Sequence, residues 1–169
     1  MGSNQLSREL RKNYLSPARM REWHLVHRQL LIACQQLGWR LNNKKSPYSL
    51  IHKALLAGSL SFIGFHDEKG VYKGPRGLKF KVFPGSVLSD ISPKWVIAGG
   101  ITETQRVYGR TVASVKPQWI EEVAGNLVKR RFSDPHWSKK RGETLAQETV
   151  EIYGLCLADS RSVSYSHID

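Results

Sequence analysis

The chain is poor in the residues that disulfide frameworks, metal centres and membrane spans require. Among its 169 residues only Cys34 and Cys156 are cysteines, and they lie far apart without metal-ligand spacing. This predicts two buried thiols in a reducing cytoplasm. No stretch approaches the roughly 18–20 consecutive apolar residues of a membrane span, and the chain opens on no secretory signal. We therefore expect a cytoplasmic protein without a membrane partner.

The sequence also lacks the residues that hold a nucleoside triphosphate. It contains no GxxxxGKS or GxxxxGKT phosphate loop, and Gly74-Pro75-Arg76-Gly77 carries neither the required Lys-Ser/Thr nor a following helix. His24 and His27 could share a helix face, but no third ligand stands at metal-binding spacing. We expect this fragment to have no catalytic residue, metal site or cofactor, and not to be an enzyme by itself.

Acidic residues are scarce relative to basic ones. Lys and Arg total 26 against 14 Asp and Glu, a formal net charge of +12. A surplus of this size favours polyanionic partners, of which nucleic acid is the commonest. The alternative is that the cationic charge only keeps the protein soluble. With 40% apolar residues the chain is expected to fold around a proper core.

Two amphipathic helices are predicted in the first third of the chain. Ser16-Pro17 is typical of a helix start, and apolar residues from Met20 to Leu41 then recur every three or four positions. Trp23 falls on this stripe, so we expect it to be buried. Ser46-Pro47 repeats the start signal, and a second stripe predicts a helix that ends around Gly64. A short polar loop joins the two helices, which we expect to pack as a pair.

A β region follows the polar turn at residues 66–70. Leu78, Phe80 and Val82 alternate with Lys79 and Lys81, which is the two-residue period of a half-buried strand. Further strands are predicted at 95–98, from about 106 to 115, at 149–157 and at 161–165, with a helix beginning at residue 117. Short strands and Gly-rich corners indicate a small closed antiparallel β-barrel.

The predicted fold class is therefore α+β, with a small barrel between helices and a short β extension. We expect three regions: a helical region at 1–65, the barrel at 66–127, and an extension at 128–169 that packs on the barrel.

Several short motifs, which follow one another along the chain, make this prediction of the fold more specific. They are Phe83-Pro84-Gly85-Ser86, Trp95-Val96, Glu103-Thr104 and Pro117-x-Trp119-Ile120, followed by Asp134–Gly142 and Tyr153-Gly154-Leu155. Together they resemble the oligonucleotide/oligosaccharide-binding (OB) fold near the C-terminus of DEAH-box ATP-dependent RNA helicases, and the last two are similar to the bacterial HrpA type. The resemblance covers about Tyr14 to Asp169. One departure is Gly100, where the pattern usually carries an acidic residue.

The resemblance implies an accessory domain that guides single-stranded RNA, and possibly DNA, to motor domains of the same polypeptide. This chain has no Asp-Glu-x-His box, so ATP, magnesium and ATP hydrolysis are expected in those motor domains. Two alternatives stay open: a protein-docking or regulatory module of the helicase, and a free-standing RNA-binding protein.

Basic residues near aromatic ones are the candidate nucleic-acid contacts, because OB folds bind single strands with cations and ring faces together. The candidates are Lys73, Arg76, Lys79 and Lys81 at the first hairpin, and Arg106 and Arg110 as a second basic row on one strand face. The resemblance adds Ser86 and the backbone amides around Gly85 as donors to phosphate or sugar. Tyr72 and Phe83 are expected in the core. The basic clusters at 129–131 and 139–141 are either a nucleic-acid surface or solubilising charge.

Overall fold

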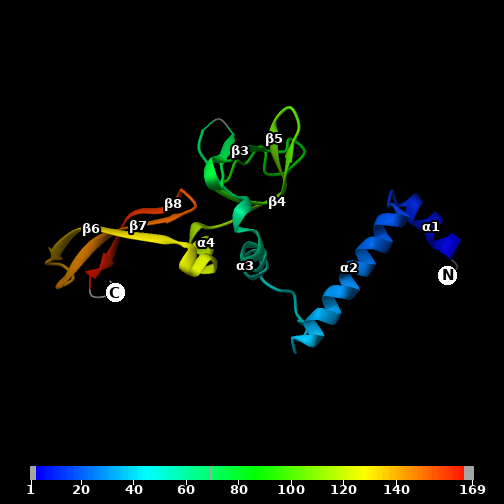
Figure 1. The fold of residues 1–169 in the computed structure, drawn as a ribbon, viewed down its shortest axis with the longest axis horizontal. Coiled ribbons are helices and arrows are strands. Elements are labelled where there is room, and N and C mark those ends of the chain that lie inside the picture. The colour runs from blue at the N-terminus through cyan, green and yellow to red at the C-terminus, as the bar shows by residue number, and fades with distance from the viewer. Residues whose placement is uncertain (1–2, 69, 166–169) are drawn as a thin grey trace. The chain divides into compact units, whose positions relative to one another are not determined.

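The computed structural model describes residues 3–68 and 70–165, which contain four α-helices and eight β-strands (Figure 1). The chain divides into two compact units, Met1–Ser46 and Pro47–Asp169, which we call the N-terminal unit and the barrel unit. Within the described residues, no helix is both long enough and apolar enough to cross a membrane.

The N-terminal unit consists of α1 (Ser3–Lys12) and α2 (Pro17–Gln36). The start of α2 is as predicted: the Oγ of Ser16 accepts a hydrogen bond from the backbone N–H of Arg19, and Pro17 occupies the first turn. The helix ends earlier than expected. Gly38 has φ +72°, a left-handed conformation that glycine adopts without strain, so the helical repeat stops there and does not run on to Leu41.

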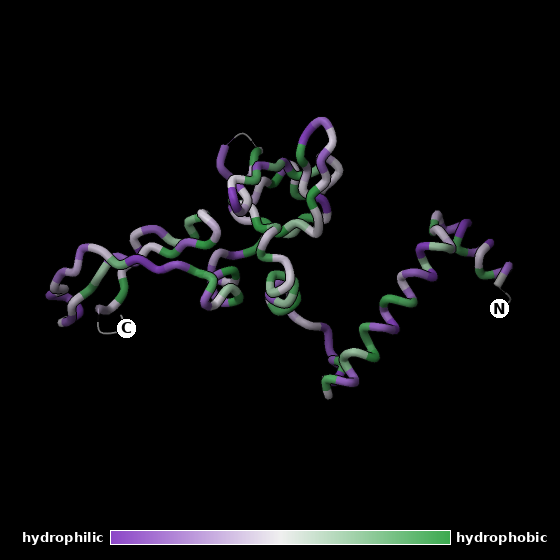
Figure 2. The backbone as a smooth tube through the Cα atoms, in the orientation of Figure 1, coloured by the Kyte–Doolittle hydropathy of each residue, from purple (hydrophilic) through white to green (hydrophobic). Residues whose placement is uncertain are grey.

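Within the N-terminal unit, the apolar stripe of α2 stays largely exposed. Figure 2 shows hydrophobic positions recurring along the helix, yet none of its residues is buried. Trp23 is 61% exposed, and Leu30 is exposed to the same degree. The prediction that Trp23 is buried is therefore wrong, because periodicity reports a preference for burial and does not supply the partner surface.

The barrel unit opens with α3 (Tyr48–Ser59), which continues into a short 3-10 helix at Leu60–Phe62. The start is close to the predicted one, although Pro47 makes no side-chain cap. The end differs: residues Ile63–His66 form strand β1, not the last turn of the helix. The expected division at residues 65 and 66 falls inside this strand, and α3 belongs to the same compact unit as the barrel.

Five short strands close into the barrel. They are β1, β2 (Val71–Lys73), β3 (Lys79–Val82), β4 (Trp95–Glu103) and β5 (Val107–Ser114), in the order β1-β2-β3-β5-β4. Four of the five pairings are antiparallel, but β3 and β5 pair in parallel with Lys81 opposite Tyr108. The predicted α+β fold with an OB-type barrel is confirmed, and the barrel is mixed instead of purely antiparallel.

Phe80 fills the barrel interior between two glycines. A Cβ at Gly64 would lie 2.5 Å from the Phe80 ring, and one at Gly109 would lie 2.9 Å from it, so both strands must approach this ring without a side chain. Tyr72 stacks on Phe80 with ring centroids 5.7 Å apart, and its hydroxyl donates to the carbonyl of Pro93. Tyr72 therefore lies in the core, as expected.

The extension folds as a second sheet beyond helix α4 (Pro117–Ala124). Its strands are β6 (Lys129–Ser138), β7 (Glu143–Ile152) and β8 (Leu155–Ser164), in sequential antiparallel order. A turn at Tyr153-Gly154, with φ +50° and +84°, interrupts the single strand that was predicted over 149–157. In Figure 1, α4 lies between the barrel and this sheet.

One apolar cluster joins the three parts of the barrel unit. Ile63 and Trp95 from the barrel, Ile120 from α4, and Val150 and Ile152 from β7 belong to the same buried set. Trp119 is partly buried against this set. Trp95 is thus a core residue and Trp119 packs against the core, in contrast to Trp23.

Candidate nucleic-acid interface

The first candidate groove lies over the β2–β3–β5 side of the barrel. Alternation along β3 buries Phe80 and Val82 and turns Lys79 and Lys81 outward, as the sequence predicted. Arg106, in the turn before β5, lies beside them, because β5 pairs with β3. The groove has a volume of about 320 Å³. Among the described residues none of these three cations has a carboxylate partner.

A second hollow, of about 430 Å³, lies beyond the end of β3. The guanidinium of Arg110 sits 4.1 Å from the centre of the Phe83 ring, a cation–π contact at the hollow's wall. Ser86 also lines it. The backbone N–H of Ser86 already donates to the carbonyl of Phe83, and its Oγ accepts from the backbone N–H of Leu88 at 3.3 Å. Ser86 can therefore still donate its hydroxyl hydrogen to a ligand. Phe83 is only partly buried, which corrects the expectation that it lies in the core.

Tyr108 contacts a residue of each hollow, and sequence reasoning missed it. Its Cα is paired with Lys81, and its ring meets that of Phe83 edge-on at 5.9 Å. The sequence does contain a signal for Tyr108, because it alternates with Arg106 and Arg110 along the predicted strand. We define the basic track as the four cations and the Phe83 ring that line these hollows, together with Tyr108, which contacts Phe83: Lys79, Lys81, Phe83, Arg106, Tyr108 and Arg110.

Arg106 and Arg110, which alternation predicts on one strand face, line different hollows. Arg106 lies in the first hollow and Arg110 in the second. Thr111 has φ +52°, so the regular two-residue repeat of β5 is disturbed next to Arg110.

The structure sets Lys73 and Arg76 apart from the basic track. Lys73 faces Lys79 in register, but its Nζ lies 2.8 Å from Oδ2 of Asp67 and is partly neutralised. Arg76 has φ +56° in the 3-10 turn between β2 and β3, and its backbone N–H donates to the carbonyl of Tyr153 in the β7–β8 turn. Arg76 therefore marks a contact between the barrel and the extension.

Three arginines of the extension sheet, Arg130, Arg131 and Arg161, are engaged in close ion pairs. Arg161 makes a bidentate contact with the carboxylate of Glu121 on α4, at 2.9 and 3.0 Å, and also donates to Glu148 at 2.6 and 2.9 Å. Arg130 bridges the same two carboxylates at 2.6 and 2.7 Å. We call these residues the four-charge cluster. Nearby, Arg131 pairs with Glu151.

The four-charge cluster shifts the ionisation of its members. The hydrogen bond from Arg161, assisted by Arg130, holds the pKa of Glu121 below its usual range. Burial by itself would raise the pKa of Glu148, which is only 4% exposed, yet the hydrogen bonds from Arg130 and Arg161 outweigh burial and lower it. The contacts with Glu121 and Glu148 raise the pKa of Arg161. These side chains fasten α4 to the sheet and are not free to meet phosphate.

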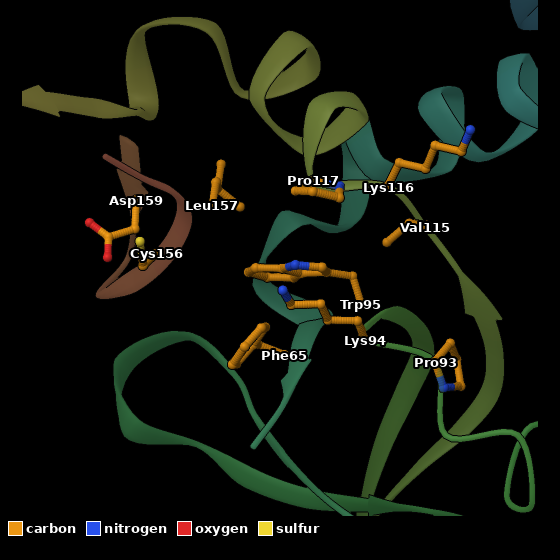
Figure 3. Close-up of a pocket in the computed structure, with 10 residues that line it drawn as sticks. All are labelled: Phe65, Pro93, Lys94, Trp95, Val115, Lys116, Pro117, Cys156, Leu157 and Asp159. Carbon is orange, nitrogen blue, oxygen red and sulfur yellow. The ribbon is translucent and has the colours of Figure 1, made fainter. Parts of the chain in front are cut away.

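A separate cavity of about 390 Å³ lies where the barrel, α4 and β8 meet (Figure 3). Phe65, Trp95 and Leu157 give it apolar walls, and Lys94 and Asp159 supply charge. Cys156 also lines it and is exposed, and Cys34 is partly exposed, so the prediction of two buried thiols is wrong. Within 3–68 and 70–165, no group of three or more His, Cys, Asp or Glu side chains is placed to hold a metal ion.

Comparison with known proteins gives the same fold for the barrel. Residues 51–127 match the model of the oligonucleotide/oligosaccharide-binding (OB)-fold family. The ATP-dependent RNA helicase HrpA of Escherichia coli K12 is 42% identical over an alignment of 170 residues that covers 100% of this chain and 13% of that protein. The HrpA homolog of Haemophilus influenzae is 41% identical over 98% of this chain and 13% of its own length.

This chain therefore spans about an eighth of the length of these relatives. Among solved structures, the DExH-box NTPase HrpB of E. coli is similar over 80% of this chain and 16% of its own, with a TM-score of 0.49 and 16% identity. That likeness is too distant to transfer any feature to this chain. The match of the barrel to the family model and the identity along the whole chain lead to one assignment: the chain belongs to the OB-fold region of the HrpA-type ATP-dependent RNA helicases.

Proposed function

We propose that this chain is the accessory nucleic-acid-binding domain of an ATP-dependent RNA helicase, and that it guides single-stranded RNA to the motor domains of the same polypeptide. ATP and magnesium then bind in those motor domains, where hydrolysis takes place. This fragment binds the RNA strand and directs it to the motor domains, and it does not itself hydrolyse ATP.

The observation that carries the proposal is the basic track. Four cations without carboxylate partners among the described residues line two hollows of an OB barrel, and the partly buried Phe83 ring lines the second hollow and meets the Tyr108 ring edge-on. Cations neutralise phosphates, while ring faces accept unstacked bases. The relatives at 41–42% identity are named as RNA helicases, which supports RNA as the ligand.

The exposed apolar side chains of α2 favour a second, compatible role for the N-terminal unit. A helix with exposed apolar side chains along one stripe is typical of a surface that packs against another domain. We propose the motor domains of the same polypeptide as that partner.

DNA should compete with RNA for the basic track, since phosphate contacts do not distinguish the two sugars.

The test is the salt dependence of RNA binding by the purified chain. For a single strand, log K should fall with log salt concentration by about 0.7 for each phosphate neutralised. The double variant Lys79→Ala/Lys81→Ala should make this slope shallower by about that amount per residue and weaken binding on every sequence.

Lys139→Ala/Lys140→Ala is the matched control, because it removes the same charge from the distal β6–β7 turn. Equal losses in the two variants would mean that net charge, and not the basic track, binds the strand. A flat salt response of the unaltered chain would contradict RNA binding and favour the protein-docking alternative.

A further inference from the structure

Gly100 holds a position beside the basic track on the outer face of the barrel. In the antiparallel β4–β5 pair it lies directly opposite Arg110. The neighbouring Gly109 faces the barrel interior, where a Cβ would meet the Phe80 ring, so alternation along β5 turns Arg110 outward. Residues directly opposite each other project from the same face of a sheet. A side chain at position 100 would therefore lie next to that of Arg110.

The fold does not require a glycine at this position. A Cβ on Gly100 would have no described atom within 4 Å, and the φ of Gly100 lies outside the left-handed region. Gly64 and Gly109 differ in this respect, because each approaches the Phe80 ring too closely for a side chain. Glycine inside a strand lowers stability, so what Gly100 contributes is the absence of a side chain beside Arg110.

The extension sheet shows what an acidic side chain on the neighbouring strand does to an arginine. Arg131 lies opposite Thr149, and Glu151, two residues along β7, reaches it diagonally and forms an ion pair. Directly opposite residues bring their Cβ atoms to about 4.5–5.5 Å, closer than diagonal neighbours. An acidic residue opposite Arg110 would therefore be better placed to pair with it than Glu151 is to pair with Arg131.

Arg110 is held in a different way in this chain. Its guanidinium lies 4.1 Å from the centre of the Phe83 ring, and no carboxylate of the described residues pairs with it. A ring face holds a guanidinium without neutralising its charge, so the cation stays available at the wall of the second hollow. A carboxylate at position 100 would neutralise this cation and draw it across β5, away from Phe83.

We propose that Gly100 is a positioning residue that sets the affinity for RNA. By placing no carboxylate opposite Arg110, it leaves the guanidinium on Phe83 and free to bind a phosphate of the strand. Gly100 acts through Arg110 and contacts no ligand itself. The inference rests on the proposed function, because the phosphate is taken to belong to single-stranded RNA.

The experiment compares Gly100→Glu with Gly100→Gln, which has nearly the same size and no charge. Binding of a labelled oligo(U) strand to the full chain is followed by anisotropy over a series of salt concentrations. Gly100→Glu should make the salt slope shallower by about 0.7 and lower the affinity about fivefold at 0.1 M salt, as expected for one lost phosphate contact. Gly100→Gln should change neither. Equal losses in the two variants would mean that bulk matters and not charge, and would overturn the proposal.

The same substitution in an Arg110→Ala background separates pairing from an effect of charge at a distance. Gly100→Glu should cause little further loss there, because the cation through which it acts is gone. A loss of the same factor in both backgrounds would overturn the proposal. Gln118→Glu adds one negative charge to an exposed position of α4 outside both hollows, and it should lower the affinity less than Gly100→Glu does.

A last readout needs no RNA. At low salt, Gly100→Glu should melt about 1–3 °C higher than Gly100→Gln, the size of one cross-strand ion pair, and this gain should disappear in the Arg110→Ala background. No gain would mean that the carboxylate does not reach Arg110, which overturns the proposal. A gain with unchanged RNA affinity also overturns it and leaves the proposed function intact. Absence of RNA binding by the unaltered chain overturns both.

Discussion

The barrel and the extension sheet both carry basic residues, but these residues differ in whether a carboxylate pairs with them. Lys79, Lys81 and Arg106 border a groove of the barrel without a carboxylate partner among the described residues. On the sheet, Arg130, Arg131 and Arg161 are engaged by glutamates of α4 and β7.

The difference lies in what the chain places beside each cation. β7 supplies Glu148 and Glu151 directly opposite the basic strand β6, and α4 adds Glu121. The residues around the barrel groove supply no such acid. A charge cluster in a sequence therefore indicates a polyanion site only if its members are not paired with acidic side chains of the same chain. Four predictions test this difference between the barrel and the sheet, from the largest expected effect to the smallest.

Glu148→Leu should cause the largest loss of stability. It leaves two guanidinium groups with Glu121 as their common partner, and removal of one member of a buried ion-pair network costs about 3–5 kcal/mol. The arginine side chains are 39–40% exposed, so we expect about 3 kcal/mol, the lower end. Urea unfolding measures it. A loss below about 1 kcal/mol would show that the cluster does not fasten the sheet.

Acidification should lower the stability that the four-charge cluster gives to the extension sheet. The pKa values of Glu121 and Glu148 are lowered in the folded chain, so their contribution to stability is complete above the unfolded value, about 4.3, and is lost as the pH falls through the lowered values. Urea midpoints between neutral pH and about pH 3 measure this. The variant Glu148→Gln should show a smaller pH dependence, and an equal one would contradict the assignment.

Arg110→Ala should weaken RNA binding with little effect on folding. It removes one phosphate contact and the cation over the Phe83 ring, an exposed contact of about 0.5–1 kcal/mol. The salt slope should become shallower by about 0.7. Arg131→Ala is the paired control on the sheet, and the two slopes are compared by anisotropy titration. Identical salt slopes for the two variants would show that free and paired cations contribute equally to RNA binding.

Glu151→Gln should have the smallest effect and the most direct bearing on the comparison. It releases Arg131 from an exposed ion pair, at a cost of less than about 1 kcal/mol in unfolding free energy. If pairing is what withholds Arg131 from RNA, the released cation should raise affinity slightly and steepen the salt slope. An unchanged slope would mean that the position of Arg131 on the sheet, and not its pairing, keeps it from the strand.

Local patterns predicted a large part of the fold. Ser16-Pro17 predicted the start of α2, Pro117 the start of α4, and alternation placed Lys79 and Lys81 opposite Phe80 and Val82. Each signal lies within a few residues of the structure it indicates, because capping and periodicity are local properties. The order of the motifs further predicted the OB fold and its helicase family.

Long-range pairing decided what those patterns could not. Ile63–His66 is a strand because β2 and β4 pair with it, although its residues extend a helical stripe. Arg161 is neutralised by Glu121, forty residues earlier in the chain, and Arg106 joins Lys81 through the parallel β3–β5 pair. The cavity with Lys94 and Asp159 likewise exists only where the barrel meets β8.

The sequence by itself determined the chain's charge, its family, most of its elements and the outward face of β3. Only the tertiary structure decided which cations remain free, that Tyr108 joins Phe83, and that a separate cavity forms. The physical reason is that helix and strand periods are set by backbone geometry over neighbouring residues, whereas the partner of a charge is set by whichever distant element folds against it.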